Sequence, residues 1–187
     1  MTTLKSEIIR FAECDAEQAD AILDSLRPVR LEKGRFLLID GQVCESYFFV
    51  ASGALRLYYH KNDQDYTAWI ATPGQIFTDL ESYLSESRSR MNIEAIEPSL
   101  VLTILKRDSD RLAQTSPAYN TLLRRTVEEA FVNLSKNVIS FQSDEAIERY
   151  RRLEAEKNWL GKFPLKYISS FIGITQSSLS RVRANKR

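Results

Sequence analysis

The spacing of apolar and polar positions changes along the chain. Over residues 4–26 apolar residues recur at helical spacing, and Asp15 with Gln18 forms a capping-box pattern, so two short helices are predicted. From 29 to 105 short apolar runs rich in Phe, Tyr, Val and Ile alternate with turn residues, which is typical of an antiparallel sandwich or barrel. We expect Pro28 to end the helical part.

The predicted strands are separated by turns that contain Gly, Pro, Asn or Asp. Leu55 and Leu57 fall on one face of their strand, as a period of two requires. A short helical stretch near 78–84 interrupts the series. The strands are expected within residues 36–40, 46–51, 54–60, 65–71, 91–97 and 100–105.

A stretch without glycine runs from about 108 to 156, and Pro117 opens a long helical pattern within it. Apolar residues step through this pattern by four and three positions. Such a wide stripe predicts a helix that covers both its own barrel and a partner helix. A helix packed only on its own barrel is the alternative. The stripe consists of Val127, Phe131, Leu134, Val138 and Phe141.

The segment 164–183 has the pattern of two short helices that grip each other. Ser169 is small where the helices would cross, Gly173 supplies the turn, and Thr175 is a natural N-cap for a helix that begins near Gln176. The pattern predicts a helix-turn-helix whose second helix could read a major groove, with a purely structural hairpin as the alternative. The apolar positions are Ile168, Ile172, Ile174, Leu179 and Val182.

The net charge of +1 is a cancellation between two parts of the 187-residue chain. Residues 1–156 hold 19 basic and 25 acidic side chains, a balance of −6, whereas residues 157–187 hold seven basic side chains and no acidic one. An acid-free basic end is expected to bind a polyanion, although a merely solvated tail would have the same composition.

Composition excludes several classes of protein. Apolar residues at 43% and charged residues at 27% are ordinary for a globular protein, not for a disordered or collagen-like one. Cys14 and Cys44 stand alone, which suits a reducing cytosol and gives neither a disulfide framework nor an iron–sulfur cluster. With no signal-peptide pattern and no long apolar run, we expect a cytoplasmic protein that does not bind membranes.

Chemistry-bearing motifs are scarce. The chain has one histidine, His60, next to a predicted turn, and neither a Gly-rich phosphate loop nor a nucleophile elbow. A cupin-like enzyme would need several metal-binding histidines. We therefore expect no metal site, no catalytic residues and no enzymatic activity, and the cofactor question stays open.

The whole chain resembles a transcriptional regulator of the Crp/Fnr family, in the variant common in Bacteroidetes-like bacteria. The likeness rests on KGRFLLIDGQVCESYFFVASGALRLYY, with Gly34, Gly41 and Gly53 at turns, and on RYRRLEAE and FPLKYISSFIGITQSSLSRVR near the other end. It implies an α+β fold: an N-terminal antiparallel β-roll of the cyclic-nucleotide-binding type (a cupin-like double-stranded β-helix) with flanking helices, then a long dimerisation helix and a C-terminal helix-turn-helix. The implied domains are 1–116 (β-roll sensor), 117–141 (dimerisation helix) and 142–187 (DNA binding).

The resemblance implies a homodimer that binds palindromic double-stranded DNA, with half-sites about 34 Å apart. RNA polymerase is a further candidate partner. The base-contacting positions of the family fall on Gln176, Ser177 and Arg181, whose side chains suit adenine and guanine edges. Phosphate contacts are expected from Lys166, Ser170, Ser178, Ser180 and Arg183.

The sensor half departs from the family's cyclic-AMP pattern. Thr78 stands where a Gly would let backbone approach a phosphate, Asp79 replaces a Glu, and the Arg-Ser pair is reversed to Ser89-Arg90. With Arg88 these residues form a candidate pocket for an unidentified small-molecule effector. Its occupation is expected to bias helix 117–141 and hence the spacing of the recognition helices. A ligand-binding module that acts through protein partners without DNA is the alternative function.

Overall fold

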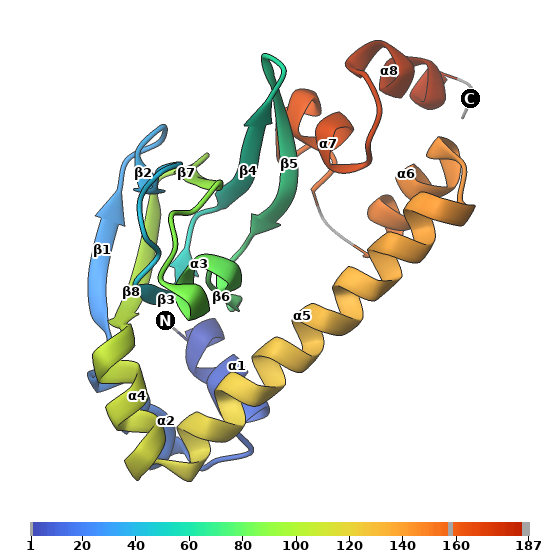
Figure 1. Ribbon diagram of the computed structural model, residues 1–187. Helices are drawn as coiled ribbons and strands as arrows, with labels where there is room; N and C mark the ends of the chain where they lie inside the picture. The colour runs from blue at the N-terminus through green and yellow to red at the C-terminus, as the bar shows by residue number, and fades with distance from the viewer. Residues whose placement is uncertain (1, 157–158, 185–187) are drawn as a thin grey trace.

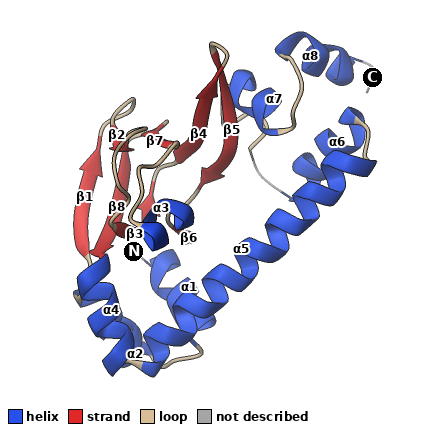
Figure 2. Cartoon of the chain, viewed as in Figure 1, coloured by secondary structure: helices blue, strands red, loops and turns tan. Residues whose placement is uncertain are grey.

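The computed structural model describes residues 2–156 and 159–184, and its strands form one block with helices beside it (Figures 1 and 2). The long helix α5 leaves this block at a slant and reaches the C-terminal helices (Figure 1). The elements are α1 (Thr2–Ala12), α2 (Ala16–Asp24), β1 (Arg27–Leu31), β2 (Phe36–Leu38), β3 (Ser46–Ser52), β4 (Leu55–Lys61), β5 (Gln64–Ala71), β6 (Ile76–Phe77), α3 (Leu80–Ser85), β7 (Asn92–Ala95), β8 (Ser99–Leu105), α4 (Lys106–Thr115), α5 (Pro117–Ser143), α6 (Ala146–Glu156), α7 (Leu165–Phe171) and α8 (Gln176–Ala184).

The predicted antiparallel β-roll is present as two four-stranded sheets, in the orders β1-β8-β3-β6 and β2-β7-β4-β5. Leu55 and Leu57 point into the space between the sheets, where they pack with Phe48, Val50 and Ile93. The intervening residues of β4 therefore point to the outer face of the second sheet. That outer face carries the C-terminal part of the molecule.

The helical part ends at Asp24, before Pro28, but a strand begins earlier than the sequence pattern predicted. Pro28 lies inside β1, a strand that the sequence pattern missed, and is paired with Leu102 of β8. β1 is the outermost strand of its sheet, so a residue without an N–H group costs no ladder hydrogen bond on the outer side.

Helices α1, α2, α4 and α5 cover the outer face of the first sheet. The predicted capping box is confirmed, because Gln18 N donates to Asp15 Oδ1 at 2.8 Å and Asp15 N donates to Gln18 Oε1 at 3.2 Å. At the centre of this layer Tyr119 is fully buried, and its hydroxyl lies 2.8 Å from the Ser109 hydroxyl. Burial raises the pKa of Tyr119 far above that of an ordinary phenol.

The long helix α5 begins at Pro117 as predicted and ends at Ser143, two residues beyond the expected limit. Its first turns, including Leu122, are buried against the roll and α1. From Val127 onward the apolar stripe is exposed: Phe131 is 68% and Leu134 is 60% accessible. Within the described residues no helix combines the length and apolar character that a membrane span needs.

Glycines at two turns allow a matched test of the backbone. Gly34 and Gly53 both have positive φ (+81° and +84°), but only at Gly53 would an added Cβ meet other atoms, 2.5 Å from Pro98 O and overlapping Ser99. We expect Gly34→Ala to lower the free energy of unfolding by about 1–2 kcal/mol through backbone strain. Gly53→Ala should cost roughly 1–3 kcal/mol more through overpacking. Urea denaturation of both variants measures the difference, and equal losses would contradict the close approach of Pro98 to this turn.

Candidate functional site

Helices α7 and α8 form the pair that the sequence predicts between residues 164 and 183. Ile168, Ile172 and Leu179 are buried between them and their neighbours. Gly173 has φ +74°, a conformation that favours glycine, and an added Cβ would lie 2.8 Å from the Phe141 ring, which would have to move. The side chain of Val182 lies outside the described part of the chain.

The start of α8 presents the predicted base-contacting residues to solvent. Thr175 is the N-cap, because its Oγ1 accepts a hydrogen bond from Ser178 N at 3.1 Å. The side chains of Gln176, Ser177 and Arg181 are exposed on the helix that follows. A cap at Thr175 thus fixes the first turn of α8 while its outward residues remain accessible.

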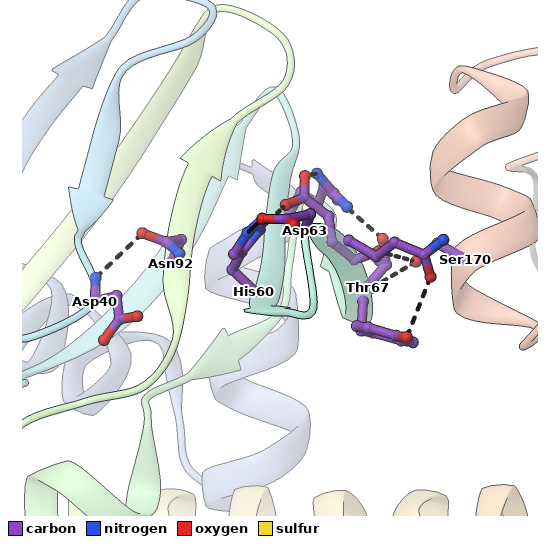
Figure 3. Close-up of polar contacts among 10 residues, drawn as sticks. Asp40, His60, Asp63, Thr67, Asn92 and Ser170 are labelled. Carbon is purple, nitrogen blue, oxygen red and sulfur yellow. Dashed lines mark hydrogen bonds and ion pairs between the residues drawn. The ribbon is translucent and has the colours of Figure 1, made fainter.

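The residues predicted to contact phosphate divide into two groups. Lys166, Ser180 and Arg183 are exposed, and Ser178 lies next to them with its hydroxyl accepting a hydrogen bond from Thr175 at 2.9 Å. Ser170, in contrast, faces the roll: its Oγ accepts from Thr67 N at 2.8 Å and donates to Asp65 O at 2.9 Å (Figure 3). Ser170 therefore gives partners to two backbone groups of the edge strand β5, Thr67 N–H and Asp65 C=O.

A buried arginine lies beside this contact. Arg56 is only 3% exposed, and it donates from Nε to Thr67 Oγ1 at 2.9 Å and from Nη1 to Asp65 Oδ2 at 3.0 Å. Its guanidinium lies 4.0 Å from the ring centre of Tyr58 and 4.4 Å from that of Tyr167 on α7. The charge is thus paired, hydrogen-bonded and flanked by aromatic faces, as burial of a charge requires.

The carboxyl group of Asp65 contacts both this arginine and His60, the only histidine of the sequence. His60 Nδ1 lies 3.1 Å from Asp65 Oδ1. Partial burial by itself would raise the pKa of Asp65, but the hydrogen bonds from His60 and Arg56, with the charge of Arg56, outweigh it and leave this pKa below its ordinary value. The charged form of Asp65 is therefore favoured in the folded protein.

An apolar cluster joins the C-terminal helices to the outer face of the second sheet. The roll contributes Ala54, Ile70 and Ile96, and the rest comes from α6, α7, α8 and the segment before α7. Trp69 of β5 lies 5.8 Å from Phe171 and 5.7 Å from Trp159, measured between ring centres, in edge-to-face geometry. We call this set the shared cluster. Its buried members are Ala54, Ile70, Ile96, Tyr150, Leu153, Trp159, Phe163, Ile168, Ile172 and Leu179.

The five residues of the predicted effector pocket lie around α3 and the loop that follows it. Asp79 caps α3 and accepts a hydrogen bond from the Ser89 hydroxyl at 2.5 Å. The Thr78 hydroxyl donates to Ser46 O at 2.8 Å. Arg90 is exposed, and its Nη2 lies 3.5 Å from Glu81 Oε2. Arg88 is also exposed and forms an isolated β-bridge with Val43. The structure thus brings Asp79 and Ser89 together, and the polar groups of Thr78, Asp79 and Ser89 already bond within the protein.

Two cavities border α5, and neither was foreseen from the sequence. The first, of about 430 Å³, lies between α1, the β5–β6 region and α5, and the second, of about 360 Å³, lies between α5, α6 and α7. Trp69 lines both. A partial signal was present, because Trp69 and Ile70 are adjacent apolar residues on a strand, which indicates that both faces of that strand are covered.

Among residues 2–156 and 159–184, no group of three or more His, Cys, Asp or Glu side chains is placed so that it could hold a metal ion. Cys14 and Cys44 are both free thiols. His60 lies near the end of β4, with Nε2 4.0 Å from Asp63 Oδ1 and Nδ1 3.1 Å from Asp65 Oδ1.

Comparison with known proteins identifies the architecture. Residues 28–116 match the family model of the cyclic nucleotide-binding domain. A TM-score of 0.70 relates the chain to a CooA mutant from Carboxydothermus hydrogenoformans, at 19% identity over 88% of this chain and 78% of that one. FixK2 from Bradyrhizobium japonicum aligns with a TM-score of 0.72, at 18% identity over 86% of this chain and 83% of that one. The chain has the fold of a Crp/Fnr regulator.

A third structure extends the same likeness. The regulator CLP from Xanthomonas campestris aligns with a TM-score of 0.73, at 13% identity over 91% of each chain. A search of curated proteins finds no match. In the Crp/Fnr fold of this chain, the cyclic nucleotide-binding domain corresponds to the two sheets with α3 and α4, and α5 follows directly after it.

The contacts of Asp65 with Arg56 and His60 predict that the stability of the protein depends on pH. Because the folded-state pKa of Asp65 is depressed, its contribution is present above the unfolded pKa of about 4 and is lost as the pH falls through the folded pKa. We expect Asp65→Asn to reduce thermal stability at neutral pH and to lose less of it on acidification than the wild type does. Melting temperatures between neutral pH and about pH 3 measure this.

Asp63→Asn is the matched control, since it removes the same charge from the same hairpin without a bond to Arg56. Parallel acid profiles for Asp65→Asn and the wild type would refute the assigned role.

Proposed function

We propose that the protein is a dimeric, sequence-specific DNA-binding transcription regulator that responds to a small molecule through its roll. The observation that carries the proposal is the exposed face of α8, which bears Gln176 and Arg181 in a C-terminal region without acidic residues, on a chain with a Crp/Fnr fold. The neighbour CLP is described as a c-di-GMP-responsive global regulator that links cell–cell signalling to virulence gene expression, which supports regulation as the role of this fold.

Base recognition falls to the outward residues of α8. Arg181 suits a bidentate contact with guanine O6 and N7, Gln176 suits adenine N6 and N7, and Ser177 suits either. Lys166, Ser178, Ser180 and Arg183 are placed for phosphates, which orient the protein without reading sequence. Ser170 would join them only after leaving Asp65 and Thr67.

Dimerisation falls to the exposed stripe of α5. Residues from Val127 to Phe141 offer an apolar row that the described part of their own chain leaves 37–68% exposed. A second copy of α5 would bury this row in a coiled-coil seam. Two recognition helices about one turn of DNA apart would then bind a palindromic operator. RNA polymerase remains a candidate partner of the bound dimer.

The same proposal assigns the protein no enzymatic activity, because binding to DNA requires recognition and not catalysis. The competing function, a ligand-binding module that docks on protein partners through α7 and α8, differs in its response to salt. Binding to DNA weakens steeply with ionic strength, with a log–log slope of about −0.9 per phosphate neutralised.

Replacement of Arg181 tests base recognition. We expect Arg181→Ala to lose about 5- to 150-fold in its preference for a selected duplex over random DNA, the value of one bidentate contact. Lys166→Ala should weaken both duplexes equally and reduce the salt slope by about one. Fluorescence anisotropy with a duplex that the wild type selects from a random pool measures both, and Arg27→Ala, at an exposed arginine on the far edge strand, is the control. Unchanged selectivity in Arg181→Ala would remove Arg181 from the reading role.

The stripe on α5 is tested by a charge at its most exposed member. Phe131→Asp should convert the dimer into a monomer, because two carboxylates would be buried in the seam. Leu84→Asp is the matched control: Leu84, on α3, is 64% exposed, close to the 68% of Phe131. Sedimentation equilibrium measures the mass, and a Phe131→Asp dimer as tight as wild type would contradict this interface.

A further inference from the structure

The larger cavity has the position and lining of a small-molecule site. It measures about 430 Å³ and lies between three separate parts of the chain: α1, the β5–β6 region and α5. Apolar side chains form much of its wall, among them Phe11, Trp69, Ile76 and Phe77. Volume and composition are those of pockets that enclose organic molecules.

One wall residue of α5 carries an unsatisfied polar group. Thr126 is only 9% exposed, and among the described residues its Oγ1 has no hydrogen-bond partner. Buried hydroxyl groups are almost always bonded, since an unpaired one loses its hydration without compensation. Thr126 lines the cavity, so a molecule inside it can provide the missing partner.

The charges around the cavity disfavour an anion. Its charged lining residues are Glu7, Arg10 and Glu129. Arg10 already bonds Glu7, with Nε 3.0 Å from Oε2, which leaves the negative charge of Glu129 uncompensated within the lining. A phosphate or carboxylate placed here would be repelled by this lining, which carries one net negative charge.

The hydroxyl groups of the predicted effector pocket around α3, which do not line this cavity, already have partners. The Ser89 hydroxyl donates to Asp79, and the Thr78 hydroxyl donates to Ser46 O. Asp79 itself adds a carboxylate to this region. The hydroxyl groups of Thr78 and Ser89 would have to give up these bonds before they could donate to the phosphate of a cyclic nucleotide.

We propose that this cavity binds an uncharged organic molecule, held by apolar contact with Phe11, Trp69 and Ile76 and by a hydrogen bond to Thr126 Oγ1. Trp69 lies in edge contact with Phe171 of α7, so a molecule against Trp69 also bears on the packing of α7. Through α7, the bound molecule would also affect DNA binding, and only this effect on DNA binding rests on the proposed function.

Two fluorescent probes of the same skeleton test the class of ligand. N-phenyl-1-naphthylamine is uncharged and has one N–H donor, whereas 8-anilinonaphthalene-1-sulfonate adds a negative charge. We expect the wild type to bind the uncharged probe with energy transfer from tryptophan, and to bind the sulfonate at least tenfold more weakly. Comparable or tighter binding of the sulfonate would overturn the assignment to uncharged molecules.

Two variants locate the site. Ala130→Phe fills the cavity from a solvent-exposed position of α5 and should abolish binding of the uncharged probe. Thr126→Val keeps the shape but removes the hydroxyl; it should weaken binding about three- to tenfold and raise the melting temperature of the free protein, because no unsatisfied group remains. Leu84→Ala, away from the cavity, is the control. Full binding by Ala130→Phe would exclude the cavity as the site.

The same proteins are assayed for DNA binding, which separates this inference from the proposed function. One outcome is that the wild type binds the probe, Ala130→Phe does not, and the wild type fails to bind DNA. This outcome would contradict the regulatory function and support the ligand site. DNA binding with no probe bound by the wild type would contradict the ligand site alone.

Discussion

The structure depends on a simple constraint: α7 and α8 are too short to build a core of their own. Helices of 7 and 9 residues gain little stability alone, and a unit of this size buries too small a fraction of its surface. They bury their apolar faces on Ala54, Ile70 and Ile96 of the roll instead. The exposed side of α8 is thereby held in a defined orientation with respect to the roll, which a flexibly tethered unit would not have.

The polar contacts around this cluster follow from the same docking. A helix laid against β5 would leave the N–H and C=O groups of an edge strand without water, and Ser170 satisfies both with one hydroxyl. Arg56 is enclosed at the same place and needs Asp65, Thr67 and two tyrosine rings to offset its desolvation. The junction is therefore specific in geometry as well as apolar, and β5 is the strand that both a ligand against Trp69 and the helix α7 would contact.

The long helix divides its duties along its length and around its circumference. Tyr119 and Leu122 bury its first turns in the roll, Thr126 and Ala130 face the cavity, and Phe131 and Leu134 belong to the exposed stripe. Because one rigid helix carries all three surfaces, a change at the cavity and a change at the stripe are mechanically related. This arrangement would place the proposed ligand site and the proposed dimer contact on a single element.

The sequence by itself determined what depends on short-range pattern: six of the strands, the capping box at Asp15 and Gln18, the start of the long helix at Pro117, and the pair α7–α8 with its turn at Gly173 and cap at Thr175. Periodicity and caps act over a few residues and can be recognised without tertiary contacts. It missed β1, because Pro28 argues against a strand unless the strand is known to lie at an edge.

Only the tertiary structure decided that Ser170 turns toward β5, that Thr78, Asp79 and Ser89 bond within the protein, and that Thr126 and Trp69 line one cavity. Each of these contacts joins residues far apart in sequence, and no local spacing encodes where two packed surfaces meet.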